Sequence, residues 1–561
     1  MRERLLLVAD FNVETLARYL ANTAMPGADV QAAPFGQVYQ TLSSPGPGAE
    51  WSALIWTQPD ATIDTFRRAA NFEPVDAERA LDEVRAFAES LKRFARNTRS
   101  LFVPTWTMPW WSRGYGMLEF RRDVGLAHLL SRMNLALADA VAEEPAIFVL
   151  DAQRWLAAAG PRAVTLKPWY AAKTPFSSAV FEQAAGDLSA AFNALGGRAR
   201  RLIILDLDEV LWGGIVGEVG WEGITLGGHD YAGEAFADFQ RSLKALTRRG
   251  IQLAIASKND EAVALEVFDR HPEMVLKRED FVCWRINWAD KAQNVAELLR
   301  QVNLGAESAV FIDDSPIERA RVTTAVPGVV APEWPDDPTR YREVLSALPL
   351  FDTPELTDED RGRSRMYAVD RTRQETREAA GDLDTWLQSL NITVIVEELT
   401  SADLPRATQL LNKTNQLNMA TRRLAPHELE QWASLPQNLL LTFRVSDRFG
   451  DSGLTGIVGL TFAPDHARLT DFLLSCRVMG RNVEETMLHA AVRHCRARSV
   501  ASLVAEFMPT ARNAPCLEFL ERSGLQRTTA HQFRWNAAEP YHVPRWVSVD
   551  DRTNTSSPAE R

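Results

Sequence analysis

The chain has few cysteines, no long apolar run and no surplus of positive charge. Its 561 residues include 4 cysteines, none in a C-x-x-C pair, so the sequence predicts neither a disulfide framework nor a zinc site. The net charge of −12 argues against a general nucleic-acid binder, which would be basic. No apolar run approaches the roughly 20 residues of a membrane span, and no signal peptide is recognisable. We therefore expect a cytoplasmic protein that binds neither nucleic acid nor membrane.

Length and composition predict several α/β domains. A chain of this size holds about three domains of ordinary length. The expected divisions are an N-terminal domain over residues 1–198, a second domain over 199–345, a helical connector over 346–390, a mixed α/β domain over 391–540 and a polar tail over 541–561. Apolar runs of strand length alternate with helix patterns in the first two domains, as is typical of parallel α/β layers. The predicted fold class is multidomain α/β.

The most informative segment is residues 202–214, where an apolar run ends in Asp206 and Asp208 and two glycines follow. In an open parallel sheet, ligands bind beyond the carboxyl ends of the strands. Two acids with a spacing of two residues point to the same side of a strand. Both carboxylates can therefore approach one metal ion or one phosphate group.

Three further polar positions follow in order along the same domain. Ser257 ends a second apolar run at a helix start, where a phosphoryl oxygen can be held. Lys291 stands at the start of a later helix, and Asp313 and Asp314 end a third apolar run. The residues from Ser315 onward are typical of a capping box with proline at the first helical position. Four such positions on alternating strand–helix units favour a catalytic interpretation over a purely structural one.

The order Asp-x-Asp, Ser, Lys, Asp-Asp resembles the four-motif pattern of the haloacid dehalogenase (HAD) superfamily. The resemblance implies that Asp206 attacks phosphorus and that Asp208 is the general acid and base. The implied ligands of a Mg²⁺ ion are Asp206, the Asp208 carbonyl and Asp313. Ser257 and Lys291 would neutralise the phosphoryl oxygens. Asp314 is either a support for these ligands, which we favour, or an alternative metal ligand.

The intervals between these motifs leave no room for a separate lid domain. Most of the residues between Asp208 and Ser257, and between Ser257 and Lys291, are needed for a helix and a strand. The glycine-rich segment 212–228 could form a small flap. We therefore expect an open site that a large co-substrate can approach.

Segments spread over nearly the whole chain resemble the FkbH-like proteins, HAD subfamily IIIC. They are residues 205–228, 284–291, 310–319, 412–418, 447–451, 475–481 and 509–515. The best-known members remove the phosphates of 1,3-bisphosphoglycerate and load the glyceryl unit as a thioester onto an acyl carrier protein in polyketide assembly. The resemblance implies this function here, with the carrier and a phosphorylated three-carbon substrate as partners. The rival is a simple phosphatase acting on a small phosphometabolite, and a third possibility is a noncatalytic scaffold, which the complete acidic set argues against.

Residues 391–540 resemble a GNAT-type acyltransferase fold. The expected strands and helix are residues 439–445, 454–462 and 468–475 and residues 483–496. In GNAT enzymes an R-x-x-G-x-G loop holds a pantetheine pyrophosphate on backbone N–H groups. Arg477, Gly480 and Arg481 match this loop, but Asn482 replaces its last glycine. This departure counts against coenzyme A and leaves a phosphopantetheine arm as the expected ligand.

Cys476 immediately precedes that loop and is the candidate acyl-carrying nucleophile. Neighbouring arginines and a helix start lower the pKa of a thiol, and a thiolate could carry the glyceryl unit to the carrier. The alternative is an ordinary buried cysteine. Cys283 is the rival candidate, whereas Cys495 and Cys516 lie on helix patterns and are expected to be structural.

Polar residues elsewhere in the C-terminal domain are candidates for binding the acyl or pantetheine group. The candidates are Asn412, Asn415 and Asn513, with Gln416 and Asn418 in the same amide cluster as the first two. The cluster either binds the ligand or braces the domain. A second set, Arg422, Arg423 and Arg512, either contacts an acidic carrier protein or lies on a solvated basic face.

Related proteins carry an SGNH-hydrolase-like domain in the N-terminal region. In this chain Asp10 lies close to the position where a serine nucleophile would follow the first strand, and residues 151–154 lack the expected histidine. We therefore expect a docking or structural module instead of a hydrolase. Trp106, Trp110 and Trp111 either line a binding surface or belong to a buried loop.

Overall fold

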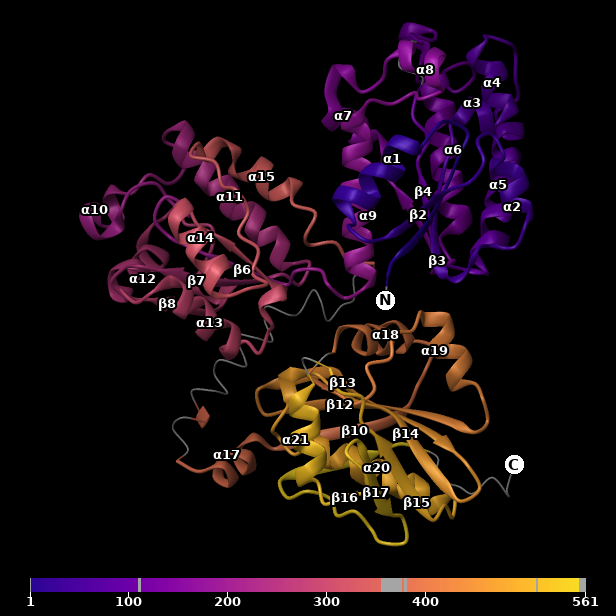
Figure 1. The fold of residues 1–561 in the computed structure, drawn as a ribbon. Helices are drawn as coiled ribbons and strands as arrows, with labels where there is room; N and C mark the ends of the chain where they lie inside the picture. Colours follow the sequence, from indigo (N-terminus) through magenta and orange to yellow (C-terminus); the bar gives the residue numbers. More distant parts are fainter. Residues whose placement is uncertain are drawn as a thin grey trace. The chain divides into compact units, whose positions relative to one another are not determined.

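The computed structural model describes residues 2–108, 112–354, 376–377, 381–414, 416–510 and 513–553. The chain divides into two compact units, Met1–Phe192 and Asn193–Arg561. The first unit has one five-stranded sheet, and the second has a four-stranded and a nine-stranded sheet (Figure 1). Among the described residues, no helix combines the length and the apolar character that a membrane span requires. The multidomain α/β fold class expected from the sequence is confirmed.

The first unit is a parallel α/β layer. Its strands are β1 (Arg4–Ala9), β2 (Asp29–Ala32), β3 (Gly48–Trp56), β4 (Thr98–Pro104) and β5 (Ile147–Leu150), in the spatial order β2-β1-β3-β4-β5. Its helices include α1 (Glu14–Tyr19), α2 (Val38–Ser43), α5 (Ala77–Ala95), α6 (Leu126–Val141), α7 (Ala152–Ala159) and α9 (Ser178–Leu195). All neighbouring strands pair in parallel, as the alternation of apolar runs and helix patterns predicts.

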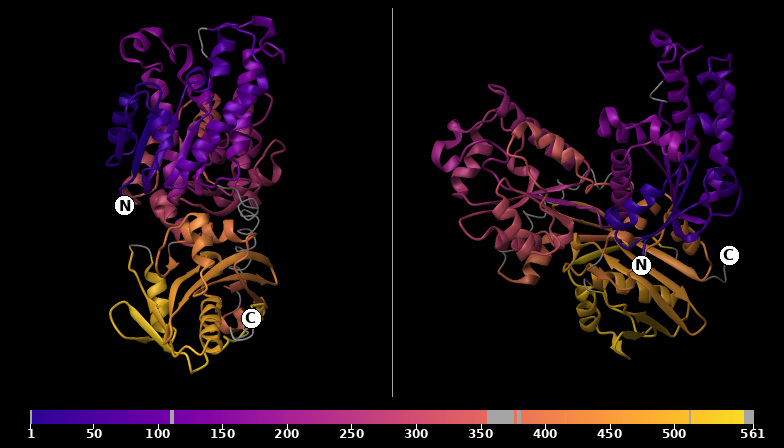
Figure 2. Two further views of the ribbon diagram at one scale, coloured as in Figure 1. Left: turned by 90° about the vertical axis from the view of Figure 1, so that its right-hand side faces the viewer. Right: turned by 45° about the horizontal axis from the view of Figure 1, so that its top comes forward.

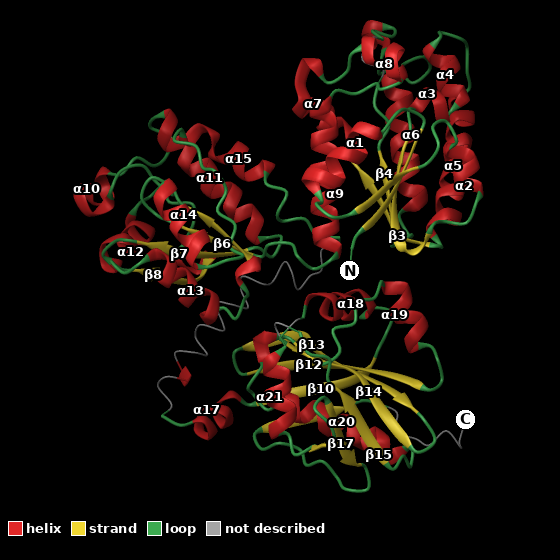
Figure 3. Cartoon of the chain, viewed as in Figure 1, coloured by secondary structure: helices red, strands yellow, loops and turns green. Residues whose placement is uncertain are grey.

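Helices cover both faces of this sheet (Figures 2 and 3). Successive side chains of a strand point to opposite faces, and β4 illustrates the consequence. Leu101 and Val103 join the cluster that contains the buried face of α5, whereas the ring of Phe102 lies 5.5 Å from that of Phe192. A strand buried on both faces is uniformly apolar, which explains why β1, β3 and β4 were recognisable in the sequence.

The middle domain, which begins near residue 199, is a second parallel layer. Its strands are β6 (Leu202–Leu205), β7 (Gln252–Ser257), β8 (Phe281–Ile286) and β9 (Ala309–Ile312), in the order β8-β7-β6-β9. Its helices are α10 (Val216–Gly223), α11 (Tyr231–Thr247), α12 (Glu261–Arg270), α13 (Lys291–Gln301), α14 (Pro316–Ala325) and α15 (Tyr341–Ala347). Ile203 and Leu205 pack in the cluster that includes α11 and α12, and Leu202 and Ile204 in the cluster that includes α13. Because all neighbouring strands pair in parallel, the carboxyl ends of all four strands meet at one edge of the sheet.

The C-terminal domain is a mixed sheet covered on both faces. Its strands are β10 (Ile392–Glu398), β11 (Leu417–Asn418), β12 (Asn438–Asp447), β13 (Gly450–Phe462), β14 (His466–Leu474), β15 (Ser502–Glu506), β16 (Gln526–Arg527), β17 (Gln532–Asn536) and β18 (Val547–Asp551). Its helices are α17 (Leu383–Leu390), α18 (Leu404–Lys413), α19 (Pro426–Ala433), α20 (Val483–Ala497) and α21 (Ala514–Arg522). One buried cluster joins the sheet to α20 and α21, and another joins it to α18 and α19. The predicted pair β12 and β13 is an antiparallel hairpin.

Two expected segments differ from the structure or fall outside it. The polar tail expected from residue 541 contains β18, which pairs in parallel with β10 and so belongs to the sheet. Of the connector expected over 346–390, residues 355–375 and 378–380 lie outside the described residues, and α17 is its last helix. The domain boundary at 540 was therefore placed too early.

Candidate active site

Asp206 lies at the carboxyl end of β6, at the centre of the four-stranded sheet. Its backbone N–H donates to the carbonyl of Ile312 at 3.0 Å, which continues the pairing with β9. The side chain is almost fully buried, and its Oδ1 accepts from the N–H of Leu207 at 2.8 Å. Its Oδ2 therefore faces the groups that the neighbouring strands bring to the same edge.

Lys291 binds two carboxylates in the buried centre of this site. Its Nζ lies 2.5 Å from Asp206 Oδ2 and 2.6 Å from Asp313 Oδ2. Asp290 caps α13 by accepting from the N–H of Ala292 at 2.8 Å, which orients the helix start that carries Lys291. Burial alone lowers the pKa of Lys291, but the two carboxylates outweigh it and hold the pKa above its usual value. The ammonium group is therefore charged and neutralises part of the acidic site.

Three carboxylates are close enough to share one cation. Asp206, Asp313 and Asp314 each offer an oxygen, and these oxygens lie within 4.8 Å of one another. Arg319 fixes the turn after β9 by donating to the carbonyls of Asp313 at 2.8 Å and Asp314 at 2.7 Å. Burial, followed by the charge of Asp206, raises the pKa of Asp313 to about 6, although Lys291 opposes the shift. An all-oxygen donor set of this kind fits a hard divalent cation such as Mg²⁺.

The placement of Asp314 favours its alternative role as a metal ligand over the supporting role that we preferred from the sequence. Its carboxylate belongs to the acidic group, so it can bind a cation directly and need not act only as a support. The carboxylate of Asp208 is not part of that group. A role of the Asp208 carbonyl as a metal ligand stays a prediction.

The Asp208 carboxylate is held by three donors instead. Trp212 Nε1 and the N–H of Val216 donate to its Oδ1 at 2.8 and 3.1 Å, and Asn259 Nδ2 donates to its Oδ2 at 2.8 Å. Burial raises the pKa of Asp208 in spite of these hydrogen bonds. Asp208 is thus a partly buried acid with a defined orientation, as proton transfer requires.

Ser257 is the last residue of β7 and is buried beside the strand that carries Asp206. The helix after it differs from the expectation of an open helix N-terminus. Asp260 caps α12 by accepting from the N–H groups of Ala262 and Val263 at 3.0 and 3.2 Å. Two of the first-turn donors are therefore occupied by Asp260, and Ser257 stays the candidate phosphate contact on this segment.

Residues 212–226, which belong to the segment expected to form a flap, fold as a small flap. We call these residues the flap. It contains α10, and Gly213 and Thr225 close its base through two backbone hydrogen bonds of 3.0 and 2.8 Å. Between Asp208 and Ser257 the chain forms only this flap, α11 and β7, so no separate lid domain is inserted there.

Sequence reasoning did not assign a role to Trp212, Asn259 or Arg319. Asn259 was visible as an amide two residues after Ser257, and Trp212 as an aromatic four residues after Asp208. Their pairing with Asp208 depends on how the flap folds back over the sheet edge, which residue spacing does not reveal. Arg319 was visible only as a cation in the first turns of α14.

The expected pantetheine loop of the C-terminal domain makes its hydrogen bonds internally. The N–H of Gly480 donates to Glu484 Oε1 at 2.8 Å. Arg481 is largely buried, donates to the carbonyl of Arg477 at 2.6 Å and lies 3.4 Å from Asp447. The N–H of Gly480 and the side chain of Arg481 are therefore bound to groups of the domain itself, and their role in binding a phosphopantetheine arm stays a prediction. Asn482 adopts the left-handed conformation, φ 60°, that its place in the loop requires.

The candidate nucleophile Cys476 begins a single 3₁₀ turn, Cys476–Val478, directly after β14. Its side chain lies outside the described part of the structure. The rival Cys283 is buried in the middle domain. Burial raises the pKa of Cys495 and of Cys516 to about 12, which agrees with structural roles for both.

The amide candidates hold backbone groups. Asn412 accepts from the N–H of Leu424 at 3.2 Å and donates to its carbonyl at 2.9 Å. Asn513 is fully buried and donates to the carbonyls of Asn418 and Met508 at 3.0 and 2.8 Å. These hydrogen bonds favour the bracing alternative for Asn412 and Asn513, and their binding of an acyl or pantetheine group stays a prediction. Asn415 lies outside the described residues.

Two of the candidate carrier-binding arginines are engaged within the domain. Arg422 forms an ion pair with the buried Asp471 and lies over the ring of Trp432, 4.7 Å from its centroid. Arg423 donates to the carbonyl of Leu411 at 2.5 Å. Arg422 is therefore not a fully solvated cation, whereas Arg423 lies at an exposed position. Arg512 lies outside the described residues.

The N-terminal unit has an aspartate at the end of β1, in the region where a serine nucleophile was sought. Asp10 Oδ2 accepts from the N–H of Gln58 at 2.8 Å, and burial raises the pKa of Asp10 to about 7. Asp151 caps α7, and no histidine accompanies it. Trp106 is buried and donates to Thr57 Oγ1 at 3.0 Å, which supports the buried-loop alternative. Trp110 and Trp111 lie outside the described residues.

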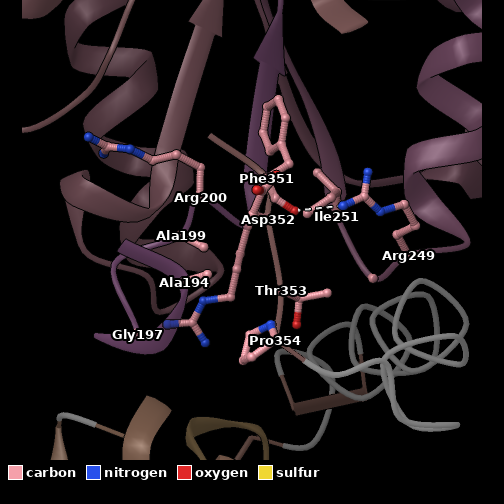
Figure 4. Close-up of a pocket in the computed structure, with 12 residues that line it drawn as sticks. Ala194, Gly197, Ala199, Arg200, Arg249, Ile251, Phe351, Asp352, Thr353 and Pro354 are labelled. Atoms are coloured by element: carbon pink, nitrogen blue, oxygen red, sulfur yellow. Dashed lines mark hydrogen bonds between the residues drawn. The ribbon is translucent and has the colours of Figure 1, made fainter. Parts of the chain in front are cut away.

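A pocket in the second unit lies at the opposite, amino ends of β6 and β7 (Figure 4). Arg200, Arg249 and Phe351 are among the residues that line it. Arg249 Nη2 donates to the carbonyl of Phe351 at 2.9 Å, and the N–H of Arg200 donates to the carbonyl of Leu350 at 2.8 Å. These hydrogen bonds connect the last residues of the middle domain to its sheet. They lie at the amino ends of the strands, whereas Asp206 and Asp313 lie at the carboxyl ends.

No protein-family model matches the chain, and no curated protein matches it. A solved structure, the N-terminal part of a Bacteroides fragilis protein containing a phosphatase domain complexed with Mg, is 26% identical, with a TM-score of 0.58. The match covers 63% of this chain and 95% of that one. The ribosomal-protein-S18-alanine N-acetyltransferase of Escherichia coli is 14% identical over 25% of this chain and 89% of its own, with a TM-score of 0.20. An IAA acetyltransferase from Bacillus cereus is 12% identical over 24% and 79%, with a TM-score of 0.19.

Proposed function

We propose that the middle domain is a Mg²⁺-dependent phosphatase of the HAD type with Asp206 as the nucleophile. The observation that carries this proposal is the convergence of Asp206 and Asp313 on Lys291 Nζ, at 2.5 and 2.6 Å, at the carboxyl edge of a parallel sheet. The likeness to a structure that contains a phosphatase domain complexed with Mg supports it.

The acidic residues fit the metal that the proposal needs. Asp206, Asp313 and Asp314 supply only oxygen ligands, and Lys291 balances only part of their charge. A bound Mg²⁺ would offset the repulsion between these carboxylates and an anionic phosphate group. We assign these three side chains as its protein ligands, together with the Asp208 carbonyl as the further candidate.

The residues of the chain can carry out the transfer in two balanced steps. In the first step an oxygen of Asp206 forms a bond to phosphorus, the bond to the leaving oxygen breaks, and Asp208 gives that oxygen a proton. In the second step Asp208 takes a proton from water, the water oxygen bonds to phosphorus, and the Asp206 carboxylate is released with inorganic phosphate. Lys291 and the Ser257 hydroxyl stabilise the charge on the phosphoryl oxygens.

The finer part of the proposal is that the chain dephosphorylates 1,3-bisphosphoglycerate and loads the glyceryl unit onto an acyl carrier protein. The Cys476 thiolate would attack the carbonyl carbon of the acyl phosphate, and the carbon–oxygen bond to phosphate would break. The carrier thiol would then attack the resulting thioester and release Cys476. The family resemblance of the segments around residues 412–418 and 475–481 supports this step.

A simple phosphatase remains the second candidate, and one observation favours it. The acidic site is complete, whereas Gly480 and Arg481 in the C-terminal domain are bound to Glu484, Arg477 and Asp447. In that case the C-terminal domain has only a binding role and does not catalyse acyl transfer. The two candidates share the chemistry of Asp206 and differ only in the fate of the acyl group.

Mass spectrometry of a candidate carrier separates the two. The full chain is incubated with Mg²⁺, freshly generated 1,3-bisphosphoglycerate and the carrier in its phosphopantetheine form. A glyceryl mass added to the carrier supports loading, and free phosphate without that mass supports the simple phosphatase. Asp206→Asn should abolish release of the 3-phosphate, whereas Asp238→Asn, on α11 and paired with Arg342 at 2.7 Å, should not. Release of the 3-phosphate that survives in Asp206→Asn rules out the proposed nucleophile.

A further inference from the structure

The Asp208 carboxylate accepts hydrogen bonds from two different segments of the chain. Trp212 Nε1 and the Val216 N–H come from the flap and bind Oδ1, whereas Asn259 comes from the segment after β7 and binds Oδ2. Each carboxylate oxygen thus has at least one directional donor. The plane of the carboxyl group is fixed by the donors and not only by packing.

The two side-chain donors are themselves immobilised. Trp212 is fully buried, and its ring lies edge-on to Phe268 of α12 with centroids 5.8 Å apart. Asn259 is 3% exposed, and its Oδ1 lies close to Gly217 of the flap, where an added Cβ would be 3.7 Å away. Asn259 therefore binds Asp208 and lies near the flap. The donors connect the position of the acid to the position of the flap.

We propose that Trp212 and Asn259 are positioning residues that align Asp208 with the leaving oxygen of the substrate. This inference rests on the proposed phosphatase function and adds the device that orients its acid. Proton transfer requires hydrogen-bond geometry, and a displacement of about 1 Å can cost about 100-fold in rate.

The role of the acid depends on the leaving group, and this dependence provides the test. When the bond from phosphorus to an alkyl oxygen breaks, the leaving oxygen must receive the Asp208 proton. A p-nitrophenolate ion is stable without a proton, so its departure needs little help. Loss of alignment should therefore slow an alkyl phosphate selectively, whereas a general disturbance of the site should slow both substrates.

The experiment measures kcat/KM of the full chain with Mg²⁺ for glycerol 3-phosphate and p-nitrophenyl phosphate. This ratio reports the first phosphoryl transfer and not the later hydrolysis of the phosphorylated Asp206, which is common to both substrates. Trp212→Phe and Asn259→Ala should each lower kcat/KM for glycerol 3-phosphate by about 10- to 100-fold. For p-nitrophenyl phosphate, the decrease should stay below about 3-fold, because the acid contributes little there.

Trp284→Phe is the matched control, because Trp284 Nε1 donates to the exposed Glu261 at 2.9 Å in the same domain. It should leave both values unchanged. Asp206→Asn should abolish turnover of both substrates, which distinguishes a failed nucleophile from a misaligned acid. If Trp212→Phe lowers the thermal midpoint so far that it cannot be assayed, Asn259→Ala decides alone.

Equal losses on the two substrates would overturn the positioning role, as would unchanged kcat/KM values in folded variants. A wild-type chain that turns over neither of these phosphates nor 1,3-bisphosphoglycerate would overturn the proposed function and this inference together. A selective loss on glycerol 3-phosphate in both variants, with normal p-nitrophenyl phosphate turnover, supports the inference.

Discussion

At the scale of single residues, the acidic site depends on one buried cation. Lys291 is 4% exposed and is the ion-pair partner of both Asp206 and Asp313. Two carboxylates at this depth repel each other unless a positive charge lies between them. Burying the lysine costs free energy as well, so the three charges are stable only as a group.

Replacing Lys291 by methionine should therefore destabilise the middle domain strongly in the absence of divalent ions. We expect a loss of about 3–5 kcal/mol, because two buried carboxylates lose their partner. Mg²⁺ should raise the thermal midpoint of the variant more than that of the wild-type chain, since the ion can replace the lost charge. Thermal unfolding in EDTA and in excess Mg²⁺ measures both effects.

Lys258→Met is the control for this prediction. Lys258 pairs with Glu318 at 2.7 Å, but its side chain is 39% exposed, so its loss should cost at most about 1 kcal/mol. A Lys291→Met chain as stable in EDTA as the Lys258→Met chain would show that the buried ion pairs contribute little.

The sequence predicted the main acidic residues better than their partners. Asp206, Asp208, Ser257 and Asp313 each follow a strand that is buried on both faces, and a strand end is readable from an apolar run. The partners of Asn412 and Asn513 could not be predicted in the same way. Both side chains bind backbone groups of loops, and loop geometry is set by tertiary contacts that residue type alone does not encode.

At the scale of elements, the first turn of α20 contains a buried carboxyl group that accepts a hydrogen bond from the loop before the helix. Glu484 is 1% exposed, its Oε1 accepts from the N–H of Gly480, and its Oε2 is buried without a partner among the described residues. Burial raises the pKa of Glu484 from 4.5 to about 7. The folded C-terminal domain therefore holds this proton more tightly than the unfolded chain does.

The stability of the C-terminal domain should fall as the pH rises from about 4.5 to about 7, because only the unfolded chain releases the Glu484 proton there. Below this window both states are protonated, and above it both are ionised. Glu484→Gln should remove the fall and make the variant the more stable protein at pH 8, by up to about 3 kcal/mol. Calorimetric unfolding at pH 4.5 and at pH 8 tests this difference.

Glu518→Gln, an exposed position on α21, should leave the pH dependence as in the wild-type chain. If Glu484→Gln behaves like this control, the Glu484 carboxyl does not titrate in the window. The burial of Glu484 would then not be the reason for the stability loss at higher pH.

A second prediction at this scale concerns β18, which sequence patterns did not reveal. Val547 and Val549 pack against the main core of the domain, and Thr553 Oγ1 lies 2.9 Å from His494 Nε2. A chain ending at residue 544 loses these contacts but keeps Tyr541. We expect its C-terminal domain to lose about 3 kcal/mol or more, because two apolar side chains leave the core and the edge of β10 is exposed.

A chain ending at residue 553 keeps β18 and is the matched control for this truncation. The two chains are compared by the thermal midpoint of the C-terminal domain. Equal midpoints would show that β18 adds nothing to the stability of the sheet.

Two edge strands, β2 and β18, were missed by sequence patterns for the same physical reason. β2 has four residues, two of them exposed, and every other residue of β18 is exposed, so neither forms an apolar run of strand length. Edge strands are buried on one face at most and lack the signal of a central strand. The predicted strands of the C-terminal sheet, β12, β13 and β14, lie at its centre, whereas the interior strands β10 and β15 were not predicted.

At the scale of the whole molecule, the parallel and mixed layers account for the division of chemistry that we propose. The phosphate site lies in the middle domain, and the candidate acyl nucleophile directly follows β14 in the C-terminal domain. The alternation of strands and helices predicted both layers. The strand that extends the C-terminal sheet beyond residue 540 was not predictable, because it follows a loop of 10 residues from Ala537 to Trp546 that has no strand pattern.

This division predicts that the two activities separate on mutation. Cys476→Ser should release the 3-phosphate of 1,3-bisphosphoglycerate at the wild-type rate but transfer less than about one hundredth of the glyceryl unit to a carrier, because a hydroxyl is a far weaker nucleophile than a thiolate. Asp206→Asn should lose release of the 3-phosphate, whereas Cys476 can still displace the acyl phosphate. Cys283→Ser, a buried cysteine of the middle domain, is the control and should keep both activities.

Phosphate release by a colorimetric assay and carrier acylation by intact-protein mass spectrometry are measured on the same samples. Normal carrier loading by Cys476→Ser would remove that cysteine from the transfer step, and a loss in Cys283→Ser alone would assign the step to the middle domain.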